Sequence, residues 1–235
     1  MARKQYVLGS IFGIPVGLDS SWFLIFGLLT WILADDYYPA EFSNWPPVRY
    51  WVMAGVTALF YFASILLHEI GHSVVALWYR IRVRSITLFM FGGVAQIEGE
   101  SPNAGAEFLI AIAGPLVSFF LAFVCNELLH VFPDNPPLLA LFEYLAYINL
   151  ALGLFNLIPG YPLDGGRVFR AVVWAITGDL QRATFIAAKV GRGFAIIFIL
   201  MGFWKILSGD LGGGLWIIFM GWFLKNAATV QYPSS

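Results

Sequence analysis

The sequence predicts an all-α polytopic membrane protein with six transmembrane helices. Small β-strand elements are expected at the N-terminus and between spans two and three. The 235 residues are 60% hydrophobic and only 11% charged, whereas soluble domains average about 25% charged residues. The apolar residues gather in long runs, and the basic residues concentrate between alternate runs. We therefore expect a single membrane-embedded domain over residues 1–235.

Six apolar segments account for the expected spans. Three of them meet the requirement of roughly 20 residues for crossing the hydrocarbon of a bilayer: Tyr50–Tyr79, Phe108–Phe132 and Leu138–Ile158. The other three are short as uninterrupted runs, so they must borrow flanking residues or lie where the bilayer is locally thin: Trp22–Ala34, Gly193–Leu207 and Leu211–Leu224.

Two further segments favour extended backbone. Tyr6–Val16 is interrupted by glycine and proline, and Arg82–Glu98 holds two β-prone runs around Gly92-Gly93. Extended backbone at membrane depth is tolerated only where it pairs within protein or lines a wet cavity. The second segment therefore predicts either a surface hairpin on the cytoplasmic side or a sheet edge that captures an extended peptide.

The basic residues set the expected orientation. With six spans, all but Arg49 and Lys205 of the 13 Lys and Arg fall on the side that holds both termini. This asymmetry is typical of cytoplasmic loops, so both termini are predicted to face the cytoplasm. The net charge of −1 gives no sign of the basic face that nucleic-acid binding needs. The lone Cys125 cannot form an intrachain disulfide.

The most specific motif lies inside the second span, at His68-Glu69-Ile70-Gly71-His72. On a helix, positions i and i+4 lie on the same face, so the two imidazoles project together. Two histidines so placed can bind one Zn²⁺, and the glutamate between them can accept a proton from the attacking water. Ionisable side chains inside apolar helices cost about 2.5–3.5 kcal/mol each, so they are rarely without function.

A catalytic zinc takes a third protein ligand and leaves one position for water. His130 ends the third span on the opposite side of the membrane and is predicted to be an interfacial polar residue. Asp164 follows the Pro159–Pro162 break, on the same side as the histidine pair. Its local sequence favours an N-cap of the next helix, whereas its place beside a broken helix favours a ligand. Both interpretations stay open on these residues alone.

Two asparagines of the fourth span have different expected roles. Asn156 lies near its cytoplasmic end, where the amide could donate to a developing oxyanion or hold the substrate backbone. The alternative for Asn156 is a hydrogen bond to a neighbouring helix. Asn149 is predicted to form such an interhelical bond.

These residues together resemble the site-2 protease family of intramembrane zinc metalloproteases. That family pairs a His-Glu-x-x-His helix with a downstream segment, here Asn156-Leu157-Ile158-Pro159 through Leu163-Asp164-Gly165-Gly166-Arg167. Two other segments also look like family motifs: Gly114–Ser118 in the third span and Phe12–Trp22 at the entry to the first. The matches cover most of the chain and occur in the family's order.

The resemblance implies that His68, His72 and Asp164 bind one zinc ion per chain, with Glu69 as the catalytic base. It implies hydrolysis of peptide bonds in or near the transmembrane segments of membrane-anchored substrates. The implied partners are the lipid bilayer and a membrane-spanning protein or peptide, in a prokaryotic cell membrane. The plan is the six-span type, without a PDZ insert and without the C-terminal CBS domains of many members.

Two other functions remain open. Some zinc carriers hold His-Glu-x-x-His in a span, so a divalent-metal transporter is one alternative. Such a carrier would need a second cluster of polar metal ligands and often has His-rich loops. This sequence has only three His. A catalytically silent membrane binding protein is the other alternative, but a structural zinc site needs no base such as Glu69. The sequence does not identify the substrate.

Overall fold

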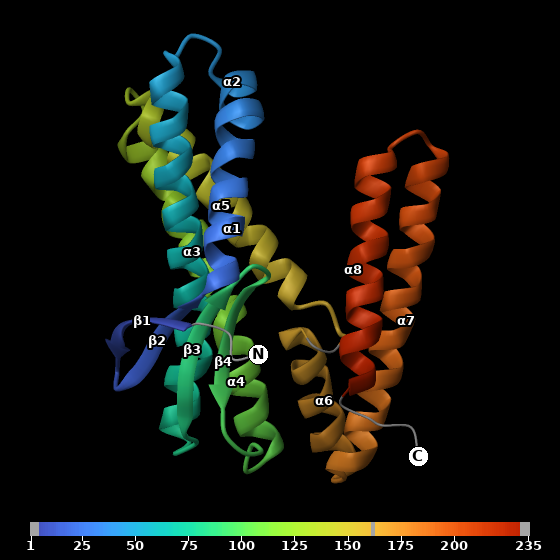
Figure 1. Cartoon of the computed structure of the whole chain (residues 1–235). Helices are drawn as coiled ribbons and strands as arrows, with labels where there is room; N and C mark the ends of the chain where they lie inside the picture. Colours follow the sequence, from blue (N-terminus) through green and yellow to red (C-terminus); the bar gives the residue numbers. More distant parts are fainter. Residues whose placement is uncertain (1–4, 161–162, 231–235) are drawn as a thin grey trace. The chain divides into compact units, whose positions relative to one another are not determined.

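The structure, a computed structural model, describes residues 5–160 and 163–230 (Figure 1). The basic start at Arg3-Lys4, and Tyr161 and Pro162 of the predicted helix break, lie outside the described residues. The strands are β1 (Gln5–Ile11), β2 (Ile14–Asp19), β3 (Val83–Phe89) and β4 (Gly92–Ile97). The helices are α1 (Ser20–Ile32), a π-helical turn η1 (Leu33–Tyr37), α2 (Tyr38–Glu41), α3 (Pro47–Trp78), α4 (Ala104–Val131), α5 (Pro136–Asn156), α6 (Asp164–Thr177), α7 (Leu180–Leu207) and α8 (Leu211–Val230).

The chain divides into two compact units. The first holds Met1–Glu100 and Leu116–Gly153, and the second holds Ser101–Pro115 and Leu154–Ser235. One boundary falls at Pro115 inside α4, where the proline removes a backbone hydrogen bond from the helix. The expectation of one membrane-embedded domain stays a prediction.

Four helices in the described part of the chain are long and apolar enough to cross a membrane: α3, α4, α5 and α7. They confirm the second, third and fourth expected spans and extend the fifth. The fifth span begins at Leu180 rather than Gly193, because its charged first turns continue the same helix. The first expected span is shorter, since α1 has 13 residues before the π-helical turn. The count of six spans stays a prediction.

Within the first unit, both predicted extended segments form hairpins and join in one sheet of order β1-β2-β3-β4. The pairs β1–β2 and β3–β4 are antiparallel, and β2–β3 is parallel. Parallel neighbours need a long crossover, which here contains α1 and α3. Figure 1 shows the sheet beside the later turns of α3. Apolar side chains on the central strands are buried, among them Val16, Leu18, Ile86 and Leu88.

A buried polar contact joins two helices of the first unit. Asn149 of α5 donates its side-chain amide to Ser64 Oγ of α3 at 3.1 Å and to the carbonyl of Leu145 at 2.8 Å. Asn149 is 1% exposed. The predicted interhelical role of Asn149 is therefore confirmed.

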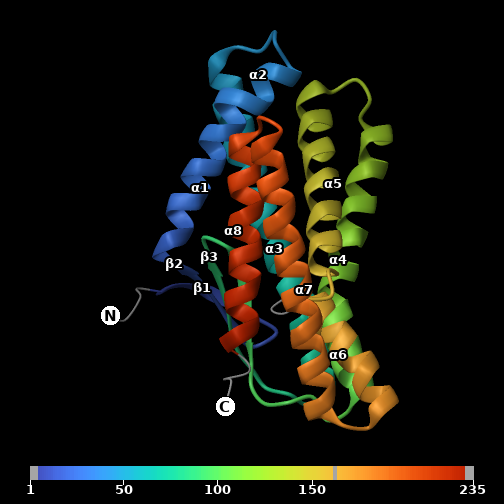
Figure 2. The same ribbon diagram turned by 90° about the vertical axis from the view of Figure 1, so that its right-hand side faces the viewer.

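The second unit contains an amphipathic helix and a helical hairpin. α6 is the amphipathic helix, and it ends at Gly178, which has a left-handed backbone. α7 and α8 run side by side along most of their length, as Figures 1 and 2 both show.

Candidate metal centre

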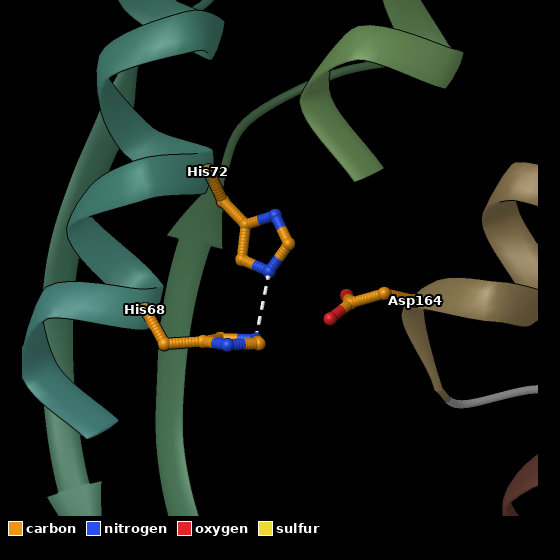
Figure 3. A group of neighbouring side chains, drawn as sticks. All are labelled: His68, His72 and Asp164. Carbon is orange, nitrogen blue, oxygen red and sulfur yellow. Dashed lines mark hydrogen bonds between the residues drawn. The ribbon is translucent and has the colours of Figure 1, made fainter. Parts of the chain in front are cut away.

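The His-Glu-x-x-His motif lies within the helix α3, as predicted. Both histidines are buried, with 3% of His68 and 4% of His72 exposed. Their Nε2 atoms lie 3.2 Å apart, the contact that Figure 3 marks with a dashed line. The spacing of four residues has thus brought two ring nitrogens together in the apolar interior of the first unit.

The geometry of this pair fits a shared metal ion. Two nitrogens at the Zn–N length of about 2.05 Å, separated by a tetrahedral angle, lie about 3.3 Å from one another. The observed separation of 3.2 Å is close to that value. A bound cation would also explain why two rings, each able to present a lone pair, face one another in a buried place.

A serine of α4 orients the first ring. His68 Nδ1 and Ser118 Oγ form a hydrogen bond of 2.8 Å, and Ser118 is fully buried. Metal-binding imidazoles commonly donate their second ring N–H to a nearby acceptor, which fixes the tautomer. This bond leaves Nε2 of His68 as the nitrogen that faces His72. The Gly114–Ser118 motif did not predict this role, although a hydroxyl in an apolar span was an available signal.

The edge strand β4 holds the glutamate of the motif. Glu69 is half-buried, and its Oε2 accepts a hydrogen bond of 3.1 Å from the backbone N–H of Ala95. A Cβ added at Gly93 would lie only 2.6 Å from Cγ of Glu69. Glycine is therefore required at position 93 for the strand to approach the helix so closely. The Gly92-Gly93 pair predicted extended runs on either side of it but did not predict this contact.

Asp164 belongs to the second unit and is half-buried. It is the first residue of α6, and Leu163 holds the N-cap position with extended backbone. The alternative interpretation of Asp164 as the N-cap residue is therefore wrong. A Cβ at Gly165 would overlap the carbonyl oxygen of Leu157. The glycine after Asp164 thus lets α6 begin directly against the chain that leaves α5.

A buried ion pair anchors α6 within the second unit. Glu107, in the first turn of α4, is fully buried. Its Oε1 accepts from Nε of Arg170 at 2.9 Å and also contacts Nη2 of Arg170, while Nε of Arg167 lies 3.7 Å away. Removing one partner of a buried pair costs about 3–5 kcal/mol. Glu107 therefore fixes the helix that begins with Asp164, a role that no motif in the sequence predicted.

The remaining candidates lie at helix ends. Asn156 is the last residue of α5 and is half-buried. His130 lies in the last turn of α4 and is exposed, and its role as an interfacial polar residue stays a prediction. His68, His72 and Asp164 each offer one ligand atom. Two imidazole nitrogens and one carboxylate oxygen are donors that zinc binds in proteins.

Comparison with known proteins identifies the family. The sequence matches the family model described as Peptidase family M50 over residues 56–134 and 134–200. It is similar to a zinc metalloprotease homologue of Synechocystis sp., with 46% identity over 94% of this chain and 58% of that protein. Rip3 of Mycobacterium tuberculosis, also named as a zinc metalloprotease, is 41% identical over 96% of this chain and 58% of its own length. The chain spans a little over half the length of these curated relatives.

A solved structure shares the fold. The Site-2 Protease from Methanocaldococcus jannaschii matches with a TM-score of 0.62 and 29% identity, over 99% of this chain and 97% of that one. The resemblance based on the sequence motifs is thereby confirmed, and the apolar helices agree with an integral membrane protein. This chain belongs to peptidase family M50, the family of the site-2 proteases.

Proposed function

We propose that this chain is an intramembrane zinc metalloprotease, which hydrolyses peptide bonds in or near the transmembrane segments of membrane-anchored proteins. The observation that carries the proposal is the pair of buried imidazole nitrogens of His68 and His72, 3.2 Å apart, with Glu69 on the same helix. Family membership and the names of the relatives support it. The six-span plan, with both termini in the cytoplasm, is part of the proposal.

The proposed ligands of one zinc ion are His68, His72 and Asp164. The spacing of the two ring nitrogens and the donor types support this set. Bound zinc would supply Lewis-acid activation of a water molecule and of the scissile carbonyl. Ser118 holds the ring of His68, and the Glu107 ion pair holds the helix of Asp164.

Glu69 is the proposed general base. It lies on the same helix as the two histidines, directly after His68, and the proposed role needs reach to the attacking water rather than to the metal. It would accept a proton from the attacking water and pass it to the leaving amine. The N–H of Ala95 fixes the orientation of one carboxylate oxygen. Asn156 is proposed to donate its amide to the developing oxyanion or to the substrate backbone.

The substrate must present an extended peptide, because a helix hides its carbonyls in internal hydrogen bonds. β4 is an outer strand of the sheet, and it passes directly over Glu69 at Gly93 and Ala95. An unwound segment of a membrane-spanning substrate could therefore pair with β4 while its scissile bond lies near the base.

The test compares variants of the purified full chain in lipid. We expect Glu69→Gln to keep about one zinc ion per chain and to lose about 10²–10⁴-fold in cleavage of a membrane-spanning peptide, since it removes only the base. The matched variant His72→Ala should lose both zinc and cleavage. Cleavage by Glu69→Gln at the rate of the unchanged chain would refute the role of Glu69. Metal uptake into vesicles without any proteolysis would refute the protease function and favour a metal transporter.

A further inference from the structure

The hairpin β1–β2 exposes an unusual amount of apolar surface. Every residue from Tyr6 to Gly13 is exposed, including Val7 at 75% and Phe12 at 72%. No Asp, Glu, Lys, Arg or His occurs between Gln5 and Leu18. Contiguous apolar patches on proteins usually mark a surface that is covered by something else. Within the described residues of the first unit, this surface of the hairpin is left uncovered.

The patch continues onto α1. The ring of Tyr6 contacts the ring of Phe23 edge-on, with centroids 5.6 Å apart. Phe23 and Leu24, in the first turns of α1, are themselves exposed. The exposed apolar side continues along this helix through Leu28, Trp31 and Ile32. The exposed surface of the hairpin and the exposed apolar side of α1 thus form one continuous face.

The tip of the hairpin places an aromatic ring outward. Phe12 has a φ of 51° and Gly13 a φ of 78°. Turns of this kind favour asparagine or glycine at the first position, because a left-handed backbone costs other residues conformational free energy. Phenylalanine gains little burial within the protein at this place, since it is 72% exposed. A phenylalanine at position 12 is explained if its ring is buried in a partner outside the protein.

The outer edge of β1 is poorly suited to pairing with another strand. The register of β1 against β2 shifts between Val7 and Gly9, which is a β-bulge. Bulges at sheet edges discourage strand addition by a peptide or by a second copy. A binding partner would therefore contact the apolar side chains of the hairpin rather than pair with its backbone.

We propose that the β1–β2 hairpin docks into the boundary between lipid headgroups and acyl chains, with Phe12 at its deepest point. Unpaired backbone cannot lie in hydrocarbon, but the boundary supplies water and headgroups to the open edge of β1. Arg3 and Lys4, directly before the strand in the sequence, add a basic element that favours anionic lipid. The proposal needs the chain to reside in a membrane and is independent of its peptidase activity.

The test measures the depth of a spin label in vesicles of phosphatidylcholine and phosphatidylglycerol. Cys125 is the single cysteine, so Cys125→Ser gives a background in which Phe12→Cys carries one label. The matched control is a label at Glu100→Cys, because Glu100 is exposed and charged in the same unit. Collision rates with oxygen and with a water-soluble nickel chelate report the depth. Equal zinc content in the two variants shows that both are folded.

We expect the label at position 12 to lie about 5–10 Å below the phosphates, and the label at position 100 to remain in water. Equal access of the nickel chelate to both labels would overturn the proposal. Protection at position 12 that disappears when protein is diluted in lipid would assign the surface to a second copy and overturn it. Protection that appears only after a substrate peptide is added would overturn it in favour of peptide binding.

Discussion

The two hairpins of the single sheet have opposite surroundings. β3–β4 packs against α3, where Gly93 touches Glu69 and the N–H of Ala95 donates to its carboxylate. β1–β2 buries Val16 and Leu18 of its second strand, but every residue from Tyr6 to Gly13 is exposed. Both hairpins have similar lengths and a glycine in or beside their turns. Secondary structure alone therefore does not separate the hairpin that supports chemistry from the one that meets lipid.

The difference arises from what each hairpin can approach. A strand without a side chain at position 93 can come close enough to hold a carboxylate through its backbone. Within the described sheet, the edge strand β1 pairs only with β2, and its large apolar side chains are left to contact solvent or lipid. The same kind of substitution should therefore have different consequences in the two hairpins.

The largest effect is expected for Gly93→Ala. The added methyl group would lie 2.6 Å from Cγ of Glu69, so either the strand or the base must move. Cleavage should fall by about 10²-fold or more, within the range that a general base contributes. Zinc content should stay near one per chain, measured by elemental analysis beside the peptide assay. Retention of full activity would show that β4 does not position the base.

A smaller effect, of another kind, is expected for Ser118→Ala. Loss of the hydrogen bond to His68 Nδ1 frees the ring to rotate. Zinc affinity should weaken by about 10–100-fold, as for other partners of metal-binding histidines. Competition with a chelator measures the affinity, and excess zinc should restore most of the cleavage. If excess zinc does not restore cleavage, Ser118 acts on the base or the substrate instead.

Gly13→Ala is the matched change in the other hairpin. Gly13 has a φ of 78° and no atom within 4 Å of an added Cβ, so the cost is conformational only. Stability should fall by about 1–2 kcal/mol, the cost of a left-handed backbone, measured by chemical unfolding in detergent. Zinc content and cleavage by the folded fraction should be unchanged. A loss of cleavage comparable to that of Gly93→Ala would remove the contrast between the hairpins.

The smallest effect on chemistry is expected for Phe12→Asp. Aspartate tolerates the left-handed backbone of this turn, and the side chain is exposed. Cleavage of a peptide in detergent micelles should stay within about 2-fold, the range of a surface substitution. A parallel zinc measurement checks that the metal site is intact. A large loss in micelles would mean that the tip contacts the substrate rather than lipid.

The sequence by itself determined the features that repeat along the chain or lie within a few residues. The apolar runs predicted the spans α3, α4, α5 and α7 because bilayer thickness sets a length. The i, i+4 spacing brought His68 and His72 together because helix periodicity is local. The two extended segments were predictable from glycine, proline and β-prone residues.

Only the tertiary structure decided which distant residues support the motif. Ser118 meets His68 across 50 positions, and Ala95 meets Glu69 across 26. The parallel pairing of β2 with β3 and the role of Gly93 likewise depend on packing that no local pattern encodes. Asp164 was ambiguous for the same reason, because a carboxylate before a helix suits both a cap and a ligand until the start of α6 is known. Local periodicity fixes directions along one element, whereas contacts between elements depend on how the whole chain buries its surface.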